Sequence, residues 1–328
     1  MKLSKKKVFA LALAVCLIAT LSMGTLAWFT DQDSVKNDFM IAGSEDGEDA
    51  VFSVDVWEDK DNDGDADDEG KGLEYDRIQP GDVLTKIAHV KNTGSYDQYI
   101  RVKITVSHAK IWQEAYGAHL IPVTEFVNGL DMDAIYGITT QLDTDADAFV
   151  YYVYFNTVLK HGDTDNDMIA FESVNICEHL TREQAVELKN EFNITVTADA
   201  IQTANVGDNV YKAFETVGMA TRLNTVEVAD YAALKAALAE EKEFIVLTNN
   251  ISMNSNRTTG KTAELYLNHF TLETPAGIYV DGEAYGLDMA GDLTISGHGI
   301  LEVNTLHINV AGTFTNCGAE ITGQGEIR

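Results

Sequence analysis

Hydrophobic and polar residues alternate with a period of two along much of the chain between residues 50 and 223. In the clearest segment, YIRVKITVS (99–107), every second residue is apolar: Ile100, Val102, Ile104 and Val106. The residues between them are expected to face solvent: Arg101, Lys103 and Thr105. The same alternation marks three further segments: 50–57, 149–159 and 192–202. Strands of this kind have one buried face and one face in water, and the pattern therefore predicts antiparallel sheets.

One segment of this region has a helical pattern instead, LTREQAVELKNEF (180–192). Thr181 is the predicted N-cap, and Gln184 three residues later completes a capping box. Turn-forming sequences such as QPGD (79–82) and HGDTDND (161–167) separate the strands. Antiparallel strands with one helix predict a β-sandwich over residues 28–223.

The pattern changes near residue 224. A helix is predicted over 230–241, with Asp230 as its N-cap and with Tyr231, Leu234 and Leu238 on one face. Very short strands follow, and from Leu287 onward they recur every six or seven residues. Three such strands make a coil of roughly 20 residues. The pattern predicts a short parallel β-helix-like (pectin-lyase-like) module over 224–328, capped at its N-terminal side by the helix. The alternative is a second β-sandwich.

The first 27 residues have the features of a signal peptide. Four lysines precede an apolar run from Val8 to Met23, and Thr25-Leu26-Ala27 has the small–x–small form of a cleavage site. Cleavage is predicted between Ala27 and Trp28. The alternative is a retained N-terminal anchor, although the run is somewhat shorter than the roughly 20 residues of a membrane span.

The chain of 328 residues is strongly acidic, with a formal net charge of −29. Loss of residues 1–27 removes four lysines and no acidic residue, which takes the charge to −33. Such a charge argues against nucleic acid as a partner and against membrane association after cleavage. It suits a secreted, extracellular protein. Only Cys177 and Cys317 remain after cleavage, either as free thiols or as a single disulfide.

The acidic segment DKDNDGDADDEG (59–70) resembles a calcium-binding loop. Aspartates alternate around Gly64, where a sharp turn is expected, and Ca²⁺ prefers this many carboxylate oxygens. The candidate ligands are Asp59, Asp61, Asp63, Asp65 and Asp67. The twelfth position is Gly70 instead of the glutamate of an EF-hand, and no helical pattern flanks the loop. The segment is therefore either an irregular Ca²⁺ loop or a solvated acidic hairpin. No other cofactor is expected.

Sequence motifs of catalysis are missing. The chain has no His-Glu-x-x-His zinc motif, no Gly-x-Ser-x-Gly elbow and no phosphate-binding loop. We therefore expect a structural or adhesive protein and not an enzyme. Two alternatives stay open: an extracellular enzyme, either a metallopeptidase or a polysaccharide hydrolase, and a calcium-dependent glycan-binding adhesin.

Three segments occur in a recognisable order: GTLAWFTDQDSVKNDFMIAG, then IQPGDVLTKIAHVKNTGSYDQYIRVKI, then FNITVTADAIQTAN. Together they resemble the TasA/camelysin family of secreted proteins of Gram-positive bacteria, over residues 1 to about 205. The resemblance implies export through a SipW-type signal peptidase, a jelly-roll-like β-sandwich, and a role at the cell surface or in biofilm matrix fibres. Some members carry a metallopeptidase label, but the zinc motif is missing here. The acidic insert at 59–70 and the module at 224–328 depart from the family pattern.

The resemblance also gives the start of the mature chain a role. In fibres of this family the mature N-terminus is thought to insert as a strand into the neighbouring subunit, where alternate side chains fill an apolar groove. The candidate anchors here are Trp28, Phe29, Phe39 and Ile41. Alternatively, the two adjacent aromatics only position the peptide at the bilayer interface before cleavage. The expected partners are the chain itself or related matrix subunits, the signal peptidase during export, and surface glycans at the C-terminal module.

Overall fold

The structure is a computed structural model that describes residues 53–61, 63, 73, 75, 78–162, 164–188, 192–204, 206–254, 257–275 and 285–328. The predicted signal peptide and the predicted donor segment lie outside these residues. Strands make up most of the regular structure, so the predicted all-β class is confirmed. Among the described residues, every helix is too short or too polar to span a membrane.

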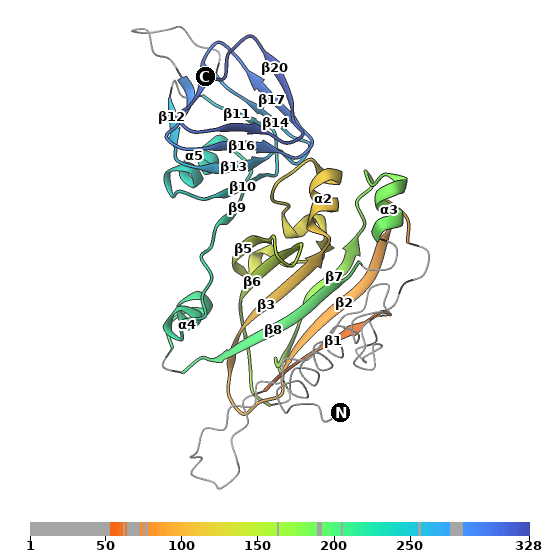
Figure 1. Cartoon of the computed structure of the whole chain (residues 1–328). Coiled ribbons are helices and arrows are strands. Elements are labelled where there is room, and N and C mark those ends of the chain that lie inside the picture. The colour runs from red at the N-terminus through yellow and green to blue at the C-terminus, as the bar shows by residue number, and fades with distance from the viewer. Residues whose placement is uncertain are drawn as a thin grey trace, which may run out of the picture.

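Two antiparallel sheets form the first part of the fold, which we call the sandwich (Figure 1). One sheet has the order β1-β2-β7-β4, with β1 (Val54–Asp59), β2 (Val83–Asn92), β7 (Asp167–Asn175) and β4 (Val127–Asn128). The other has the order β5-β6-β3-β8, with β5 (Ile135–Asp143), β6 (Ala148–Leu159), β3 (Gln98–Ser107) and β8 (Ile194–Gln202). Short 3₁₀ helices η1 (Val123–Glu125) and η2 (Met132–Ala134) flank β4.

The two sheets share one apolar core. Val90 of β2 and Phe171 of β7 belong to the same buried cluster as Val102 of β3 and Phe149 of β6. Phe126, which is fully buried, packs its ring against several aromatic neighbours in this core: Trp112, Tyr116, Phe149 and Tyr151. The alternation in the sequence therefore identified the strands that face this core. The assignment of a jelly-roll topology stays a prediction.

The predicted helix near 180–192 is present as α3 (Arg182–Leu188), and its capping box forms as expected. The Thr181 amide donates to Gln184 Oε1 over 2.9 Å, and the Gln184 amide donates to Thr181 Oγ1 over 3.3 Å. The structure adds two helices to the sandwich that the sequence pattern did not predict, α2 (Ala109–Tyr116) and α4 (Val210–Thr216).

Helix α2 lacks a local capping signal because its N-terminal amides are satisfied from a distant turn. The Asp147 carbonyl accepts from the Ala109 amide over 2.9 Å, and Asp147 Oδ1 accepts from the Lys110 amide over 3.1 Å. The residue before the helix, His108, has φ 63° and supplies no side-chain cap. A tertiary contact therefore determines where this helix begins.

Helix α4 covers the outer face of the second sheet and changes the environment of Arg101. The alternation in β3 placed this residue in solvent, and that expectation is wrong: Arg101 is 5% exposed. Its guanidinium lies over the ring of Phe214 from α4 at 4.7 Å and donates from Nε to Asp199 over 3.0 Å. A period-two pattern reports one buried face only, so a helix packed on the other face escapes it.

Residues 225–328 form a second unit, which we call the coil module. It begins with β9 (Thr225–Val228) and α5 (Tyr231–Ala239), and Asp230 caps α5 by accepting from the Ala233 amide over 2.9 Å, as predicted. Short parallel strands follow in three sheets. The first contains β10 (Phe244–Leu247), β13 (Ala263–Tyr266), β16 (Leu293–Ser296) and β19 (Phe314–Asn316). The second contains β11 (Ile251–Ser252), β14 (Thr271–Glu273), β17 (Ile300–Val303) and β20 (Glu320–Gly323). The third contains β12 (Thr258–Gly260), β15 (Tyr285–Met289) and β18 (His307–Val310).

Each strand from β10 to β17 pairs in parallel with the strand three positions further along the chain, and β9 pairs in parallel with β10. Leu293 pairs with Phe314 and Leu301 with Ile321, so the last turn takes about 20 residues, as predicted. Ala263 pairs with Leu293, so the turn before it is longer and takes 30 residues. Side chains from successive turns stack inside and are fully buried, among them Leu265, Ile295, Leu301 and Ile308. The module therefore buries its apolar residues turn against turn.

The coil module lies at one end of the sandwich, next to α2 (Figure 1). A bridge between Ile138 of β5 and Thr225 of β9 joins the second sandwich sheet to the first sheet of the coil module, which gives nine strands in order from β19 to β8. Phe244 and Tyr266 of the coil module belong to the sandwich core. The predicted boundary between 28–223 and 224–328 falls directly before β9, and this sheet crosses it.

Candidate cation site at the end of strand β1

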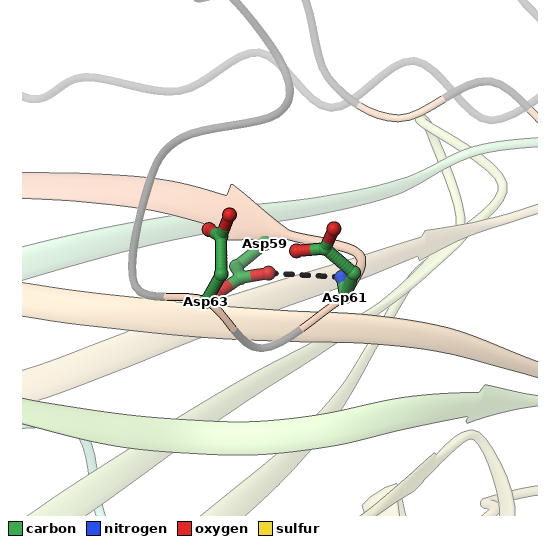
Figure 2. A group of neighbouring side chains, drawn as sticks. All are labelled: Asp59, Asp61 and Asp63. Atoms are coloured by element: carbon green, nitrogen blue, oxygen red, sulfur yellow. Dashed lines mark hydrogen bonds between the residues drawn. The ribbon is translucent and has the colours of Figure 1, made fainter.

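Three of the five predicted calcium ligands come together where β1 ends (Figure 2). Asp59 is the last residue of the strand, and Asp61 and Asp63 follow in the adjoining segment. One carboxylate oxygen from each lies within 4.8 Å of the other two. Asp59 is buried, whereas Asp61 and Asp63 are exposed. The Asp61 amide donates to Asp59 Oδ1 over 3.0 Å, which folds the chain back over the strand end. Asp65 and Asp67 lie outside the described residues.

A buried ion pair lies directly beside this cluster. Glu58 has no exposed surface and pairs with Lys86 of β2, whose side chain is 2% exposed. Glu58 Oε2 also accepts from the Leu73 amide over 3.1 Å. The β1–β2 register, in which Asp59 pairs with Ile87, puts both residues at this end of the strand. Loss of either partner would leave a buried charge without its counter-ion, which is strongly destabilising.

His89 of β2 completes the surroundings of Asp59. Its ring stacks on Trp57 with centroids 4.9 Å apart and planes 7° apart, and its Nε2 lies 3.7 Å from Asp59 Oδ2. Within the described part of the chain, neither ring nitrogen of His89 nor Trp57 Nε1 has a hydrogen-bond partner. Buried polar atoms of this kind are rare in folded proteins, and they mark the neighbourhood of Asp59 as unusual.

The chemistry of the three carboxylates suits a hard divalent cation. Ca²⁺ takes six to eight oxygen ligands at about 2.3–2.6 Å, from carboxylates, carbonyls and water. Asp59, Asp61 and Asp63 supply the carboxylate part of such a set, and a cation would offset the repulsion among three neighbouring anions. The remaining ligands would come from water or from neighbouring carbonyls.

The other acidic turns of the sequence are used differently. In the turn after β5, Asp143 Oδ1 accepts from the backbone amides of Asp145 and Ala146 over 3.1 and 2.9 Å. Next to the turn after β6, Asp97 of the β2–β3 connection accepts from His161 Nδ1 over 2.7 Å and from Lys160 Nζ over 2.9 Å. These hydrogen bonds, above all the one from His161, hold the pKa of Asp97 well below its ordinary value. Asp143 and Asp97 are thus both engaged in hydrogen bonds with the protein itself.

Sequence spacing identified the acidic residues but missed Glu58, Lys86 and His89. A signal was present, since TKIAHV (85–90) places a lysine and a histidine inside an otherwise apolar strand. The predicted cleavage residues Ala27 and Trp28 and the predicted assembly residues Phe29, Phe39 and Ile41 lie outside the described residues. The comparisons add no relative, because the chain matches no family model, no curated protein and no solved structure.

Proposed function

We propose that this chain is a secreted structural or adhesive component of a bacterial cell surface or extracellular matrix, and that copies join by adding a strand to the sandwich. The observation that carries the proposal is the position of β8 at the end of the nine-stranded sheet. An outermost strand presents a row of backbone donors and acceptors to any added strand.

Strand β8 is well suited to accept a partner. It pairs with β3 along its whole length, from Ile194 opposite Val106 to Gln202 opposite Gln98. Among the described residues, no strand pairs with its other edge. Its residues alternate between buried and half-buried over most of its length. An added strand would gain main-chain hydrogen bonds and continue this alternation into the core.

The donor in this proposal is the segment 28–42 of a neighbouring copy, with Trp28, Phe29, Phe39 and Ile41 as its apolar anchors. The family resemblance supports the choice of donor, and the unpaired edge of β8 supports the choice of acceptor. The coil module would then project from the assembled subunit and bind a further matrix partner or a surface glycan.

Divalent cations have a place in this proposal because a subunit of net charge −33 repels its copies strongly at low salt. Ca²⁺ bound by Asp59, Asp61 and Asp63 would lower that repulsion at the edge of the first sheet. We therefore expect assembly to depend on Ca²⁺.

The test is sedimentation and electron microscopy of purified residues 28–328, with millimolar Ca²⁺ and with chelator. We expect fibres or large oligomers with Ca²⁺ and fewer with chelator. Deletion of 28–42 should abolish assembly and leave the far-UV circular dichroism spectrum of the monomer unchanged.

A finer comparison separates the anchors from the rest of the segment. Phe39→Ser with Ile41→Ser should prevent assembly, whereas the matched pair Lys36→Ser with Asn37→Ser should not. A compact monomer under all conditions, or unchanged polymers after the deletion, would refute the proposed function.

A further inference from the structure

Three histidines from distant parts of the chain meet where the sandwich contacts the coil module. We call them the histidine cluster: His179, His269 and His298. The ring centroids of His179 and His298 are 4.8 Å apart, and those of the other two pairs are each 5.9 Å apart. These residues lie far from the acidic cluster in the sequence and have no part in the proposed assembly.

The winding of the coil module brings two of the three together. His269 lies in the turn between β13 and β14, and His298 lies in the turn between β16 and β17. Because β13 pairs with β16 and β14 with β17, the two turns stack, and the His269 amide donates to the His298 carbonyl. Strands in neighbouring turns lie about 4.8 Å apart, so the backbone itself sets the spacing of these two rings.

The third ring comes from the sandwich. His179 lies between β7 and α3, and its side chain is 40% exposed. His269 is also exposed, and His298 is half-buried. As placed, the ring nitrogens do not all lie within 4.8 Å of one another, as the carboxylate oxygens at β1 do. Convergence therefore requires the rings to turn about their side-chain torsions, which exposed side chains do readily.

The hydrogen bond of His298 prepares one ligand atom. Its Nε2 lies 3.3 Å from the carbonyl oxygen of Ala115 in α2. Since a carbonyl only accepts, Nε2 carries the hydrogen, and in the neutral ring Nδ1 keeps its lone pair. Metal-binding histidines are commonly oriented in this way, by donating their other ring nitrogen to a carbonyl or carboxylate.

The electrostatic surroundings favour a cation. Glu125 of η1 is half-buried and accepts from the Tyr266 hydroxyl over 3.2 Å. His179 and His298 lie close enough to this carboxyl to interact with it electrostatically. The histidine cluster therefore has a carboxyl group close by, on a protein of large negative charge.

We propose that the histidine cluster binds a divalent transition metal ion, and that Zn²⁺ bound there would link the sandwich to the coil module. For three imidazoles around one tetrahedral Zn²⁺, with Zn–N of about 2.0–2.1 Å, the ring centroids lie about 5.2 Å apart. The observed separations of 4.8 and 5.9 Å bracket that value. The fourth position would be taken by water or by a ligand from outside the chain.

The test is isothermal titration of the purified chain with Zn²⁺, repeated after His179→Ala, His269→Ala and His298→Ala. We expect one high-affinity site, and each variant should lower its affinity at least about tenfold. His161→Ala is the matched control, because His161 is an exposed histidine beside a carboxylate and should leave the affinity unchanged. Co²⁺ should give the visible absorption of a tetrahedral site, which each cluster variant should abolish.

Two further arms separate this site from the acidic cluster. A large excess of Ca²⁺ should leave Zn²⁺ binding intact, and Asp61→Asn with Asp63→Asn should do the same. Far-UV circular dichroism verifies the fold of every variant, and a glutamine replaces any alanine that disturbs it. Unchanged Zn²⁺ affinity in a folded cluster variant, or displacement by Ca²⁺, would overturn the proposal, and neither result would affect the proposed assembly.

Discussion

Glu264 of β13 holds the sandwich and the coil module together, and its removal should separate them. This carboxylate is 6% exposed. Its Oε1 accepts from Ser296 Oγ over 2.7 Å and from the Leu120 amide over 3.0 Å. Its Oε2 lies 3.2 Å from Nδ1 of His119. Two of these three contacts reach across to the sandwich segment that follows α2.

The loss of stability expected for Glu264→Ala follows from the hydrogen-bond donors that would lose their acceptor. The Ser296 hydroxyl is fully buried and would lose its acceptor, as would the half-buried Leu120 amide. An unsatisfied buried group costs about 1–3 kcal/mol. The His119 side chain is 58% exposed, so its ion pair adds at most about 1 kcal/mol. We expect a loss of about 2–4 kcal/mol, because water can reach part of the gap.

Urea denaturation measures this loss. Tryptophan fluorescence reports on the sandwich, and circular dichroism reports on both units. The wild type should show one transition, and Glu264→Ala should show two that no longer coincide. Glu320→Ala, at an exposed glutamate of β20, is the control and should change stability by less than about 0.5 kcal/mol. A loss below about 1 kcal/mol, or coincident transitions, would refute the assigned role of Glu264.

The same contact gives a dependence on pH whose sign is fixed. The hydrogen bond to Glu264 raises the pKa of His119 above its ordinary value of 6.5. A group whose pKa is raised in the folded state contributes its full stabilisation at pH values below its unfolded-state pKa. This contribution is lost as the pH rises through its folded-state pKa. The stability difference between wild type and His119→Ala should therefore shrink above about pH 6.5. A difference that grows with pH would contradict this assignment.

Three further predictions concern other parts of the molecule. Lys86→Met should lower the free energy of unfolding by about 3–5 kcal/mol, because Glu58 is left buried without its cation; adding Glu58→Gln should recover much of this in urea titrations, and an additive further loss would argue against it. Asp59→Asn should weaken Ca²⁺ binding at least about tenfold by calorimetry, whereas Asp55→Asn, at an exposed residue of the same strand, should leave the affinity unchanged. Equal effects of the two variants would mean that Ca²⁺ binds through the overall negative charge and not at this site. Asp230→Ala should lower stability by about 1 kcal/mol through loss of the α5 cap, and a thermal midpoint equal to that of wild type would contradict this.

Local sequence patterns predicted those elements whose causes are local. The β3 alternation, the capping box of α3, the Asp230 cap of α5 and the short period of the coil strands each depend on residues close together in the chain. The spacing of Asp59, Asp61 and Asp63 belongs to this class as well, since one strand end and one turn bring them together. Their discovery required no knowledge of strand pairing.

The features that the sequence did not reveal depend on contacts between distant residues. Helix α2 takes its cap from Asp147, and Arg101 is buried because α4 folds over the second sheet. The surroundings of Asp59 depend on the β1–β2 register, which brings His89 beside it. The histidine cluster needs both the stacking of coil turns and the docking of the coil module on the sandwich. None of these follows from spacing along the chain.

The two features of this interface, Glu264 and the histidine cluster, can be tested against each other. Zn²⁺ at the cluster would bind His179 from the sandwich together with His269 and His298 from the coil module, so it should oppose the separation that Glu264→Ala causes. A ligand at 100 times its dissociation constant stabilises the state that binds it by about 2.7 kcal/mol, which is close to the loss expected for Glu264→Ala.

Zn²⁺ should therefore bring the two unfolding transitions of Glu264→Ala back toward one. The same metal should have no such effect on the double variant Glu264→Ala with His179→Ala, which keeps the two coil histidines but lacks the ligand from the sandwich. If Zn²⁺ stabilised both variants equally, the ion would be bound within one unit and the link between them would be refuted. If it restored only the single variant, a buried carboxylate and a metal ion would each stabilise the interface independently. The concentration of Zn²⁺ would then determine how firmly the coil module is attached to the sandwich.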